Sequence, residues 1–159
     1  MTSVQLPEAS EERTRARIRA RSSDARESTP PPAIAGAIAG IVALLAGRQN
    51  DLTGVVLDMG DVPAFHRRVY EIARTIAPGQ TRTYGEIAAA LGDPGAARAV
   101  GQALGDNPFP IVVPCHRVLA AAGKPGGFSA HGGRATKRQL LVIEGAIPAQ
   151  GQLFPNGSP

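Results

Sequence analysis

The stretch that decides the fold is Thr83–Leu104, which reads TYGEIAAALGDPGAARAVGQAL. Its first four residues match a capping box, in which a threonine hydroxyl and a glutamate three residues later cap the start of a helix. Ile87 begins the apolar face of that helix, and the Gly-Asp-Pro-Gly at 92–95 predicts a tight turn. An alanine-rich second helix follows over 96–104. This order favours a helix-turn-helix, although any helical hairpin gives a similar pattern.

Apolar patterns on both sides of this stretch predict the rest of the domain. Residues 65–76 are apolar at helical spacing, and residues 135–143 form a closing helix with Glu144 at its end. Residues 108–114 form an apolar run bounded by prolines, which predicts a buried extended segment that leads directly to Cys115. Residues 123–133 are rich in glycine and predict a loop of the hairpin or wing type.

The first part of the chain changes from polar to apolar. Serine and two glutamates at 10–12 open a predicted short, exposed helix with alternating arginines at 13–21. These arginines fit either a basic arm on DNA or, as we prefer, a solvated helix face. A buried helix is predicted over 33–46, ended by Gly47, and a strand over 52–57.

The composition limits the possible functions. The chain has 159 residues, which is enough for one compact domain with a smaller partner. A net charge of +4 permits a nucleic-acid partner but does not prove one. One cysteine and three histidines form a poor metal site, so we expect no metal and a reducing cytoplasm. The longest apolar stretch is too short to span a bilayer, so no membrane partner is expected.

Cys115 is the candidate nucleophile. A thiol reacts as its thiolate and therefore needs a base or a positive charge nearby, and His116 and Arg117 follow it directly. Adjacent side chains of an extended segment point in opposite directions, so a water molecule would have to connect His116 with the sulfur. A lone cysteine after an apolar run is otherwise most often inert core.

Five further motifs stand around the pentapeptide Pro114–Val118. They are Thr83–Glu86, Ala97–Gly101, Asn107-Pro108, Gly127–Ser129, and Leu140-Leu141 running to Glu144-Gly145. With these motifs, residues 63–146 closely resemble the DNA-binding, active-site domain of the O6-alkylguanine-DNA alkyltransferases, also called methylated-DNA–protein-cysteine methyltransferases. The pentapeptide is the signature of that family.

The resemblance implies a one-shot reaction on alkylated guanine in double-stranded DNA. Glu144 would orient His116, and His116 would act through water to deprotonate Cys115, which accepts the alkyl group irreversibly. No cofactor would be needed. Tyr84 would crowd a phosphate to drive base rotation, and it would offer its hydroxyl to the leaving guanine. Arg98 would fill the space that the rotated base vacates.

The resemblance also implies which residues surround the base. Small residues would let the second helix approach DNA closely, and the expected contacts there are Ala97, Ala99 and Gly101. Asn107 would stiffen the link between the recognition helix and the active-site segment, main-chain groups near Cys115 and Val118 would accept from the guanine amino group, and the loop around Ser129 would donate to O6. The expected pocket residues are Asn107, Pro110, Val118, Gly126, Phe128, Ser129 and Lys137. Activity on O4-methylthymine is left open.

The sequence departs from the family pattern in three places. Phe128 stands where many members have tyrosine, the loop at 130–133 is longer than in many relatives, and residues 1–60 have room for only part of the usual N-terminal α/β domain. The predicted fold is therefore α+β, with a mostly helical, winged helix-turn-helix-like C-terminal domain and a shortened N-terminal α/β segment.

We expect three regions, which are a partly disordered N-terminal segment at 1–60, a DNA-binding and alkyl-acceptor domain at 61–147, and a flexible tail at 148–159. The protein is expected to be a monomer in the cytoplasm. Two alternatives remain. A non-catalytic sensor of alkyl lesions would lack the cysteine, whereas a helix-turn-helix transcription factor would leave the conjunction of Cys115, His116 and Glu144 unexplained.

Overall fold

Helices account for nearly all of the regular secondary structure in the described residues. The computed structural model describes residues 1–21, 26–48 and 50–149. The α-helices there are α1 (Glu11–Arg21), α2 (Pro32–Leu45), α3 (Ala64–Arg74), α4 (Tyr84–Ala90), α5 (Ala97–Gly105) and α6 (Arg134–Ile143). The two strands are β1 (Arg82–Thr83) and β2 (Val118–Leu119), and single 3-10 turns lie at Pro94–Ala96, Cys115–Arg117 and Ala121–Gly123. The architecture is α+β and mostly helical, as predicted.

The helix-turn-helix forms where the sequence predicts it. The backbone N of Glu86 donates to Thr83 Oγ1 at 3.2 Å, and the backbone N of Thr83 donates to Glu86 Oε2 at 2.6 Å, which completes the capping box of α4. Asp93 accepts from the backbone N of Gly95 at 3.1 Å and starts a 3-10 turn. Because that turn occupies Pro94–Ala96, α5 begins at Ala97, one residue later than predicted.

One continuous core joins these helices. Val69 of α3, Ile87 of α4 and Val100 of α5 are each 0% exposed and belong to the same apolar cluster. The hydroxyl of Tyr70 donates to the carbonyl of Ala103 at 2.8 Å, so the aromatic side chain that connects α3 with α5 has its polar atom satisfied. This packing holds α5 rigidly against the rest of the domain.

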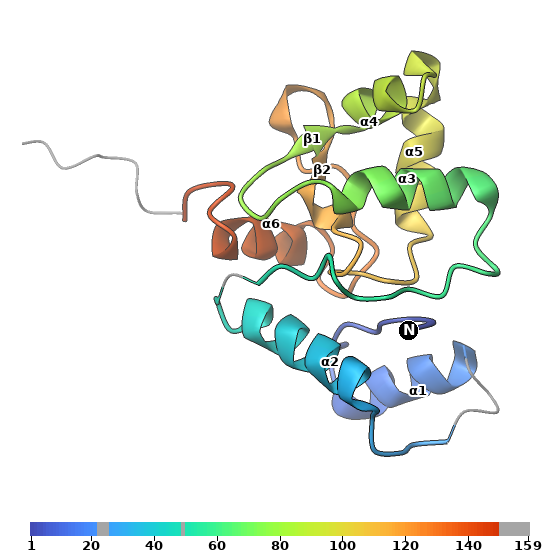
Figure 1. Cartoon of the computed structure of the whole chain (residues 1–159). Helices are drawn as coiled ribbons and strands as arrows, with labels where there is room; N and C mark the ends of the chain where they lie inside the picture. The colour runs from blue at the N-terminus through green and yellow to red at the C-terminus, as the bar shows by residue number, and fades with distance from the viewer. Residues whose placement is uncertain (22–25, 49, 150–159) are drawn as a thin grey trace, which may run out of the picture.

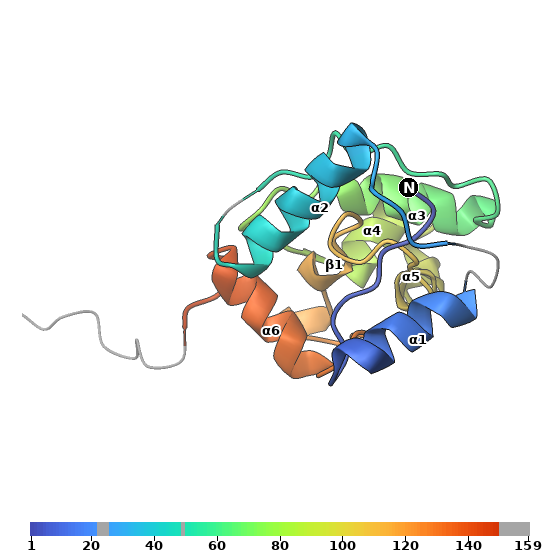
Figure 2. The same ribbon diagram turned by 90° about the horizontal axis from the view of Figure 1, so that it is seen from below.

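The N-terminal helices form a separate layer below the other helices (Figure 1). Seen from below, the chain that precedes α1 runs between α1 and α2 (Figure 2). α1 has no buried side chain, as predicted, and α2 leaves Ile38 and Val42 about half exposed, at 46% and 55%. The prediction of a buried helix is therefore correct for only one face of α2.

The predicted strand at 52–57 is wrong, because these residues form a turn and an irregular segment. No neighbouring strand is available to them within the described residues. Their backbone groups are satisfied otherwise: Val55 O accepts from the Arg74 guanidinium at 2.8 Å, and Val56 O accepts from the amino terminus of Met1 at 3.1 Å. The strand-like composition of 52–57 therefore produces no sheet, since a strand needs a paired partner.

The segment before the cysteine is buried, as predicted, but it is not extended. Ile111 has a φ of +74°, and the backbone N of Val113 donates to the carbonyl of Phe109 at 2.8 Å, so the chain turns back on itself. Residues 115–117 then form a 3-10 turn, and β2 pairs in parallel with β1, with Val118 opposite Arg82. Residues 124–133 form a loop, as predicted, but it contains no strands and is therefore not a hairpin.

No helix in the described ranges is long and apolar enough to cross a membrane.

Candidate active site

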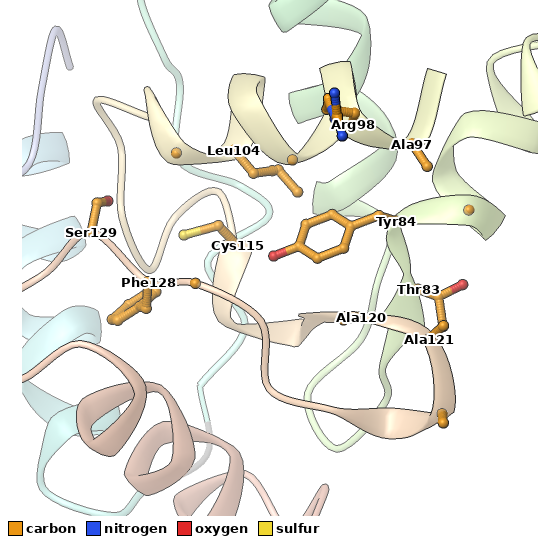
Figure 3. A pocket seen from close by; sticks show the side chains of 15 residues that line it. Thr83, Tyr84, Ala97, Arg98, Leu104, Cys115, Ala120, Ala121, Phe128 and Ser129 are labelled. Carbon is orange, nitrogen blue, oxygen red and sulfur yellow. The ribbon is translucent and has the colours of Figure 1, made fainter. Parts of the chain in front are cut away.

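A cavity of about 810 Å³ opens between the helix-turn-helix and the glycine-rich loop (Figure 3). α4 and α5 form one side of it, and the turn after β2 and the loop at 127–129 form the other. Its lining consists of Thr83, Tyr84, Gly85, Ala97, Arg98, Gly101, Leu104, Gly105, Cys115, Ala120, Ala121, Ala122, Gly127, Phe128 and Ser129. Most of these side chains are small or absent, so a flat aromatic molecule has room to enter.

Cys115 lies at the inner wall of this cavity, where the buried turn at 109–113 delivers it. The residue is 6% exposed, and burial raises the pKa of its thiol. A hydrogen bond from Asn107 and the nearby charge of Lys137 offset only part of that rise in pKa. The cysteine is therefore protonated at neutral pH and needs a base before it can act as a nucleophile.

A fully buried pair of side chains stands next to the cysteine. His116 Nε2 lies 2.9 Å from Glu144 Oε1, and both side chains are 0% exposed. Arg117 donates to both oxygens of the same carboxylate, from Nε to Oε2 at 2.8 Å and from a terminal nitrogen to Oε1 at 2.8 Å. Glu144 thus bridges an imidazole and a guanidinium in the interior, at the end of α6.

The charge states of this group follow from its contacts. Burial alone would raise the pKa of Glu144, but the hydrogen bonds from His116 and Arg117 outweigh it and lower that pKa to about 2. Burial lowers the pKa of His116, although Glu144 opposes the shift. At neutral pH the pair therefore consists of a carboxylate and a neutral imidazole.

The tautomer of His116 can be assigned on the same basis. An ionised carboxylate only accepts hydrogen bonds, so Nε2 carries the proton and Nδ1 keeps a lone pair. Nδ1 is buried and has no hydrogen-bond partner among the described protein groups. The imidazole therefore presents a free basic nitrogen, as a general base requires.

Tyr84 and Lys137 form a second polar group at the cavity. The Tyr84 ring reaches from α4 toward Cys115 (Figure 3), and burial raises the pKa of its hydroxyl. Lys137 is 0% exposed; its Nζ lies 5.9 Å from the centre of the Tyr84 ring and donates to the carbonyl of Val118 at 2.6 Å. Burial lowers the pKa of Lys137 to about 8, although the nearby Cys115 opposes this.

The expected DNA-contacting residues fall into two groups. Ala97, Arg98 and Gly101 line the cavity from α5, and the Arg98 side chain is exposed. Ala99 is also exposed on α5 but does not line the cavity. The small residues leave the backbone of α5 open to a close approach, because a Cβ on Gly101 would meet only the Tyr84 ring at 3.8 Å.

The expected pocket residues are not all in the cavity wall. Phe128 and Ser129 line it, whereas Asn107 and Pro110 line a smaller neighbouring crevice. Asn107 instead shapes the turn before Cys115, donating to the carbonyl of Val113 at 3.1 Å and accepting from the backbone N of Phe109 at 2.9 Å.

Three further expected pocket residues lie behind the cavity wall. The Val118 carbonyl is occupied by Lys137, which is itself behind Tyr84. Gly126 lies against Tyr84, and a Cβ there would come within 2.8 Å of the hydroxyl. These residues therefore support the wall without forming it.

Sequence reasoning missed the two-oxygen contact of Arg117 with Glu144 and the contribution of residues 120–122 to the cavity. The only signal for Arg117 was its place in the pentapeptide; Ala120–Ala122 carried no signal beyond their small size. Within the described chain, no group of three or more His, Cys, Asp or Glu side chains could hold a metal ion.

Several known proteins are similar to this chain in sequence. The family model described as "6-O-methylguanine DNA methyltransferase, DNA binding domain" matches residues 64–146, slightly more than half of the chain. A methylated-DNA–protein-cysteine methyltransferase of Mycolicibacterium paratuberculosis is 48% identical over 114 residues, covering 72% of this chain and 67% of that relative. One from Methanothermobacter thermautotrophicus is 40% identical over 126 residues, covering 79% and 69%.

Solved structures agree with these relatives. The Mycobacterium tuberculosis protein OGT in complex with DNA superposes with a TM-score of 0.64 at 47% identity, covering 74% of this chain and 71% of that one. A structure of the Mycobacterium tuberculosis O6-methylguanine methyltransferase covers 97% of this chain and 86% of its own, with a TM-score of 0.68 and 40% identity. The chain belongs to the 6-O-methylguanine DNA methyltransferase family.

Proposed function

We propose that the protein repairs DNA directly, by moving a methyl or other alkyl group from O6 of an alkylated guanine to the sulfur of Cys115. The family membership and the names of the relatives support this reaction. The observation that carries it is that the only cysteine of the chain lines the cavity and is followed by a buried histidine–glutamate pair.

In the proposed step, Nδ1 of His116 takes the thiol proton of Cys115 through a water molecule. The thiolate forms a sulfur–carbon bond to the alkyl carbon while the carbon–O6 bond breaks, and the electron pair of that bond stays with the guanine. The Tyr84 hydroxyl donates a hydrogen bond to a ring nitrogen of the leaving base. A neutral, buried imidazole suits this task, because its lone pair is available at neutral pH.

The target base is turned out of the double helix before it reacts, because O6 cannot reach a cavity in the protein from within the base stack. α5 lies in the DNA groove, where Ala97, Ala99 and Gly101 permit a close approach. Arg98 extends from the same helix into the space that the base leaves. The exposed Arg98 side chain at the cavity mouth supports this role.

Within the cavity, Phe128 contributes stacking and the segment around Ser129 donates to O6, since both residues line the wall. Asn107, Pro110, Val118, Gly126 and Lys137 act from behind by holding Cys115, Tyr84 and the loop in place. The open lining of 120–122 also leaves room for O4-methylthymine.

The reaction runs once per molecule. The thioether product has no good leaving group, and no base of the site can expel the alkyl group, so the protein acts as both catalyst and acceptor. A monomer carrying the unit at 61–147 is sufficient, because Cys115, His116, Glu144 and Tyr84 come from one chain. A free thiol nucleophile fits a reducing compartment such as the cytoplasm.

The alternative function is a non-catalytic protein that senses alkyl lesions and recruits other factors. Such a protein would bind alkylated DNA without changing it. The presence of Cys115 in the cavity wall favours the transferase over the sensor.

Intact mass spectrometry tests the proposal. The protein is incubated with excess duplex DNA that contains one O6-methylguanine, and Cys115→Ser serves as the control. We expect the wild type to gain the mass of one methyl group and then stop, with the modification on Cys115, whereas the control gains nothing. DNA binding without a mass change would favour the sensor, and continued turnover would contradict the single-use mechanism.

A further inference from the structure

The chain before α1 lies against the loop that forms one wall of the cavity. A polar crevice of about 270 Å³ separates them, and it is lined from one side by Gln5, Glu8 and Arg17 and from the other by Phe128 and Ser129. Phe128 and Ser129 line the main cavity as well. A change in the N-terminal segment can therefore directly affect Phe128 and Ser129, which form the substrate wall of the main cavity.

Glu8 is fixed in place by its neighbours. Its Oε1 accepts from Arg17 of α1 at 2.9 Å and from Gln5 Nε2 at 3.1 Å, and its backbone N donates to Thr14 Oγ1 at 2.9 Å. The side chain is only 13% exposed. The second carboxylate oxygen, Oε2, lies 3.7 Å from Nδ1 of His131 in the loop. The carboxylate is thus held by the N-terminal segment with one oxygen turned toward the loop.

The N-terminal segment is itself attached to the domain. The backbone N of Val4 donates to the carbonyl of Pro108 at 2.8 Å, and Leu6 is buried in the common core. Pro108 belongs to the segment that delivers Cys115. The backbone segment that carries Glu8 is therefore fixed relative to Cys115.

Few backbone hydrogen bonds anchor the loop: Ala120 N donates to the Lys124 carbonyl at 2.8 Å, and Gly133 N donates to the Ala130 carbonyl at 2.9 Å. Phe128 and Ala130 also pack, partly buried, against the apolar core. Residues 124–129 form no helix or strand, and beyond them the hydroxyl of Thr136 donates to the carbonyl of His131 at 2.6 Å. Lys137 reaches the carbonyl of Gly127 at 3.3 Å, which is a long contact. Loops with few backbone hydrogen bonds open at low free energy, so one added side-chain contact shifts how often this loop is in place.

We propose that Glu8 is a positioning residue for the substrate wall, and that it acts by holding His131 and with it the loop that carries Phe128 and Ser129. The inference rests on the proposed function, because it concerns the wall of the same cavity. When the pair is intact, the wall is preformed and the alkylated base binds without first ordering the loop. When the pair is lost, part of the binding free energy is used to order the loop.

The test uses the whole chain of 159 residues and five variants of it. Glu8→Gln and His131→Gln each remove the contact with little change in size, and His131→Arg keeps a hydrogen-bond donor opposite Glu8 that is always charged. Glu11→Gln is the matched control, because it removes an acidic partner of Arg15 on α1 without touching the loop. The double variant Glu8→Gln/His131→Gln completes a thermodynamic cycle.

Two measurements are made on each protein. Hydrogen–deuterium exchange is measured for the backbone amides of residues 124–133. Labelling of Cys115 by free O6-benzylguanine, in reactions quenched at set times, gives the half-saturation concentration and the rate at saturation. A neutral free base is used so that altered protein charge does not act through DNA phosphates.

We expect Glu8→Gln and His131→Gln each to raise loop exchange and the half-saturation concentration by up to about fivefold, the ceiling even for a fully charged pair exposed to solvent. The rate at saturation should stay within about twofold, since the His116–Glu144 pair is untouched. The double variant should be no worse than either single variant, His131→Arg should behave as the wild type, and Glu11→Gln should change neither quantity.

Unchanged loop exchange in Glu8→Gln overturns the inference, and so do additive effects in the double variant or a fall confined to the rate at saturation. Failure of the proposed function looks different: no form of the protein gains an alkyl group on Cys115 from methylated DNA or free base. In that case, hydrogen–deuterium exchange of the amides of 124–133 still shows whether Glu8 holds the loop.

Discussion

Replacing Glu144 with glutamine tests how the buried pair activates the cysteine. The carboxylate binds two partners at once, since it accepts from His116 and from the Nε and Nη2 atoms of Arg117. Glutamine has almost the same shape but carries no charge. The variant therefore leaves Arg117, which is 6% exposed, without its counter-charge, and weakens the polarisation of His116.

The cost to stability follows from the pKa of Glu144. Lowering that pKa from 4.5 to about 2 corresponds to about 3 kcal/mol of stabilisation at neutral pH, taking about 1.4 kcal/mol per pH unit. Removing one partner of a buried ion pair typically costs about 3–5 kcal/mol, which agrees. For a chain of this size we expect the melting temperature to fall by roughly 6–12 °C.

The cost to reactivity is a separate quantity. An imidazole without its carboxylate is a weaker base, so alkyl transfer to Cys115 should slow by about 10²-fold, the lower end for general-base assistance. The rate should recover toward wild type as the pH rises, because the thiolate then forms unaided. DNA affinity should barely change, since the pair is buried away from the cavity mouth.

Urea unfolding and single-turnover alkyl transfer, both from pH 6 to about 9.5, measure the two effects. Transfer is assayed well below the melting temperature of the variant, so that unfolding does not enter the rate. A Glu144→Gln protein that is as stable as the wild type would refute the electrostatic account. Wild-type reactivity at neutral pH would show that another group activates Cys115.

Three further predictions can be checked on the same material. The stability difference between wild type and Glu144→Gln should be complete above about pH 4.5 and should shrink as the pH falls toward 2, because a depressed carboxyl pKa stabilises only the ionised form; acid titrations of unfolding would contradict this if the difference stayed constant. Arg98→Ala should slow repair of duplex DNA more than labelling by a free modified base, and equal losses would argue against a gap-filling role. DNA binding, followed by fluorescence anisotropy, should weaken steadily with salt and depend little on sequence, whereas a strong preference for one undamaged sequence would favour a transcription factor.

Local signals in the sequence predicted the helix-turn-helix correctly. The capping box at Thr83–Glu86 and the turn at 92–95 act over three or four residues, so they can be read without knowing the fold. The predicted strand at 52–57 failed for the opposite reason. A strand requires a partner from elsewhere in the chain, and β-propensity does not reveal whether one is present.

In the candidate active site, too, the sequence predicted the features with local signals and not those that depend on distant contacts. The pentapeptide indicated Cys115 and His116 as candidates, but the backbone there is a 3-10 turn that follows a turn at Ile111, where an extended segment was expected. The pairing of Glu144 with His116 came from family resemblance. The two hydrogen bonds of Arg117 to that carboxylate span 27 residues of sequence and carried no local signal.

The sequence by itself indicated the helices, the capping box of α4 and the candidate nucleophile, because each depends on residue type and short spacing. Only the tertiary structure decided the charge states of Cys115 and His116 and which residues line the cavity. Burial raises the pKa of Cys115 and lowers that of His116, and it depends on every element packed around them. The contact between Glu8 and His131 likewise joins residues more than a hundred positions apart. Such contacts are set by how the helices pack, which short-range patterns do not encode.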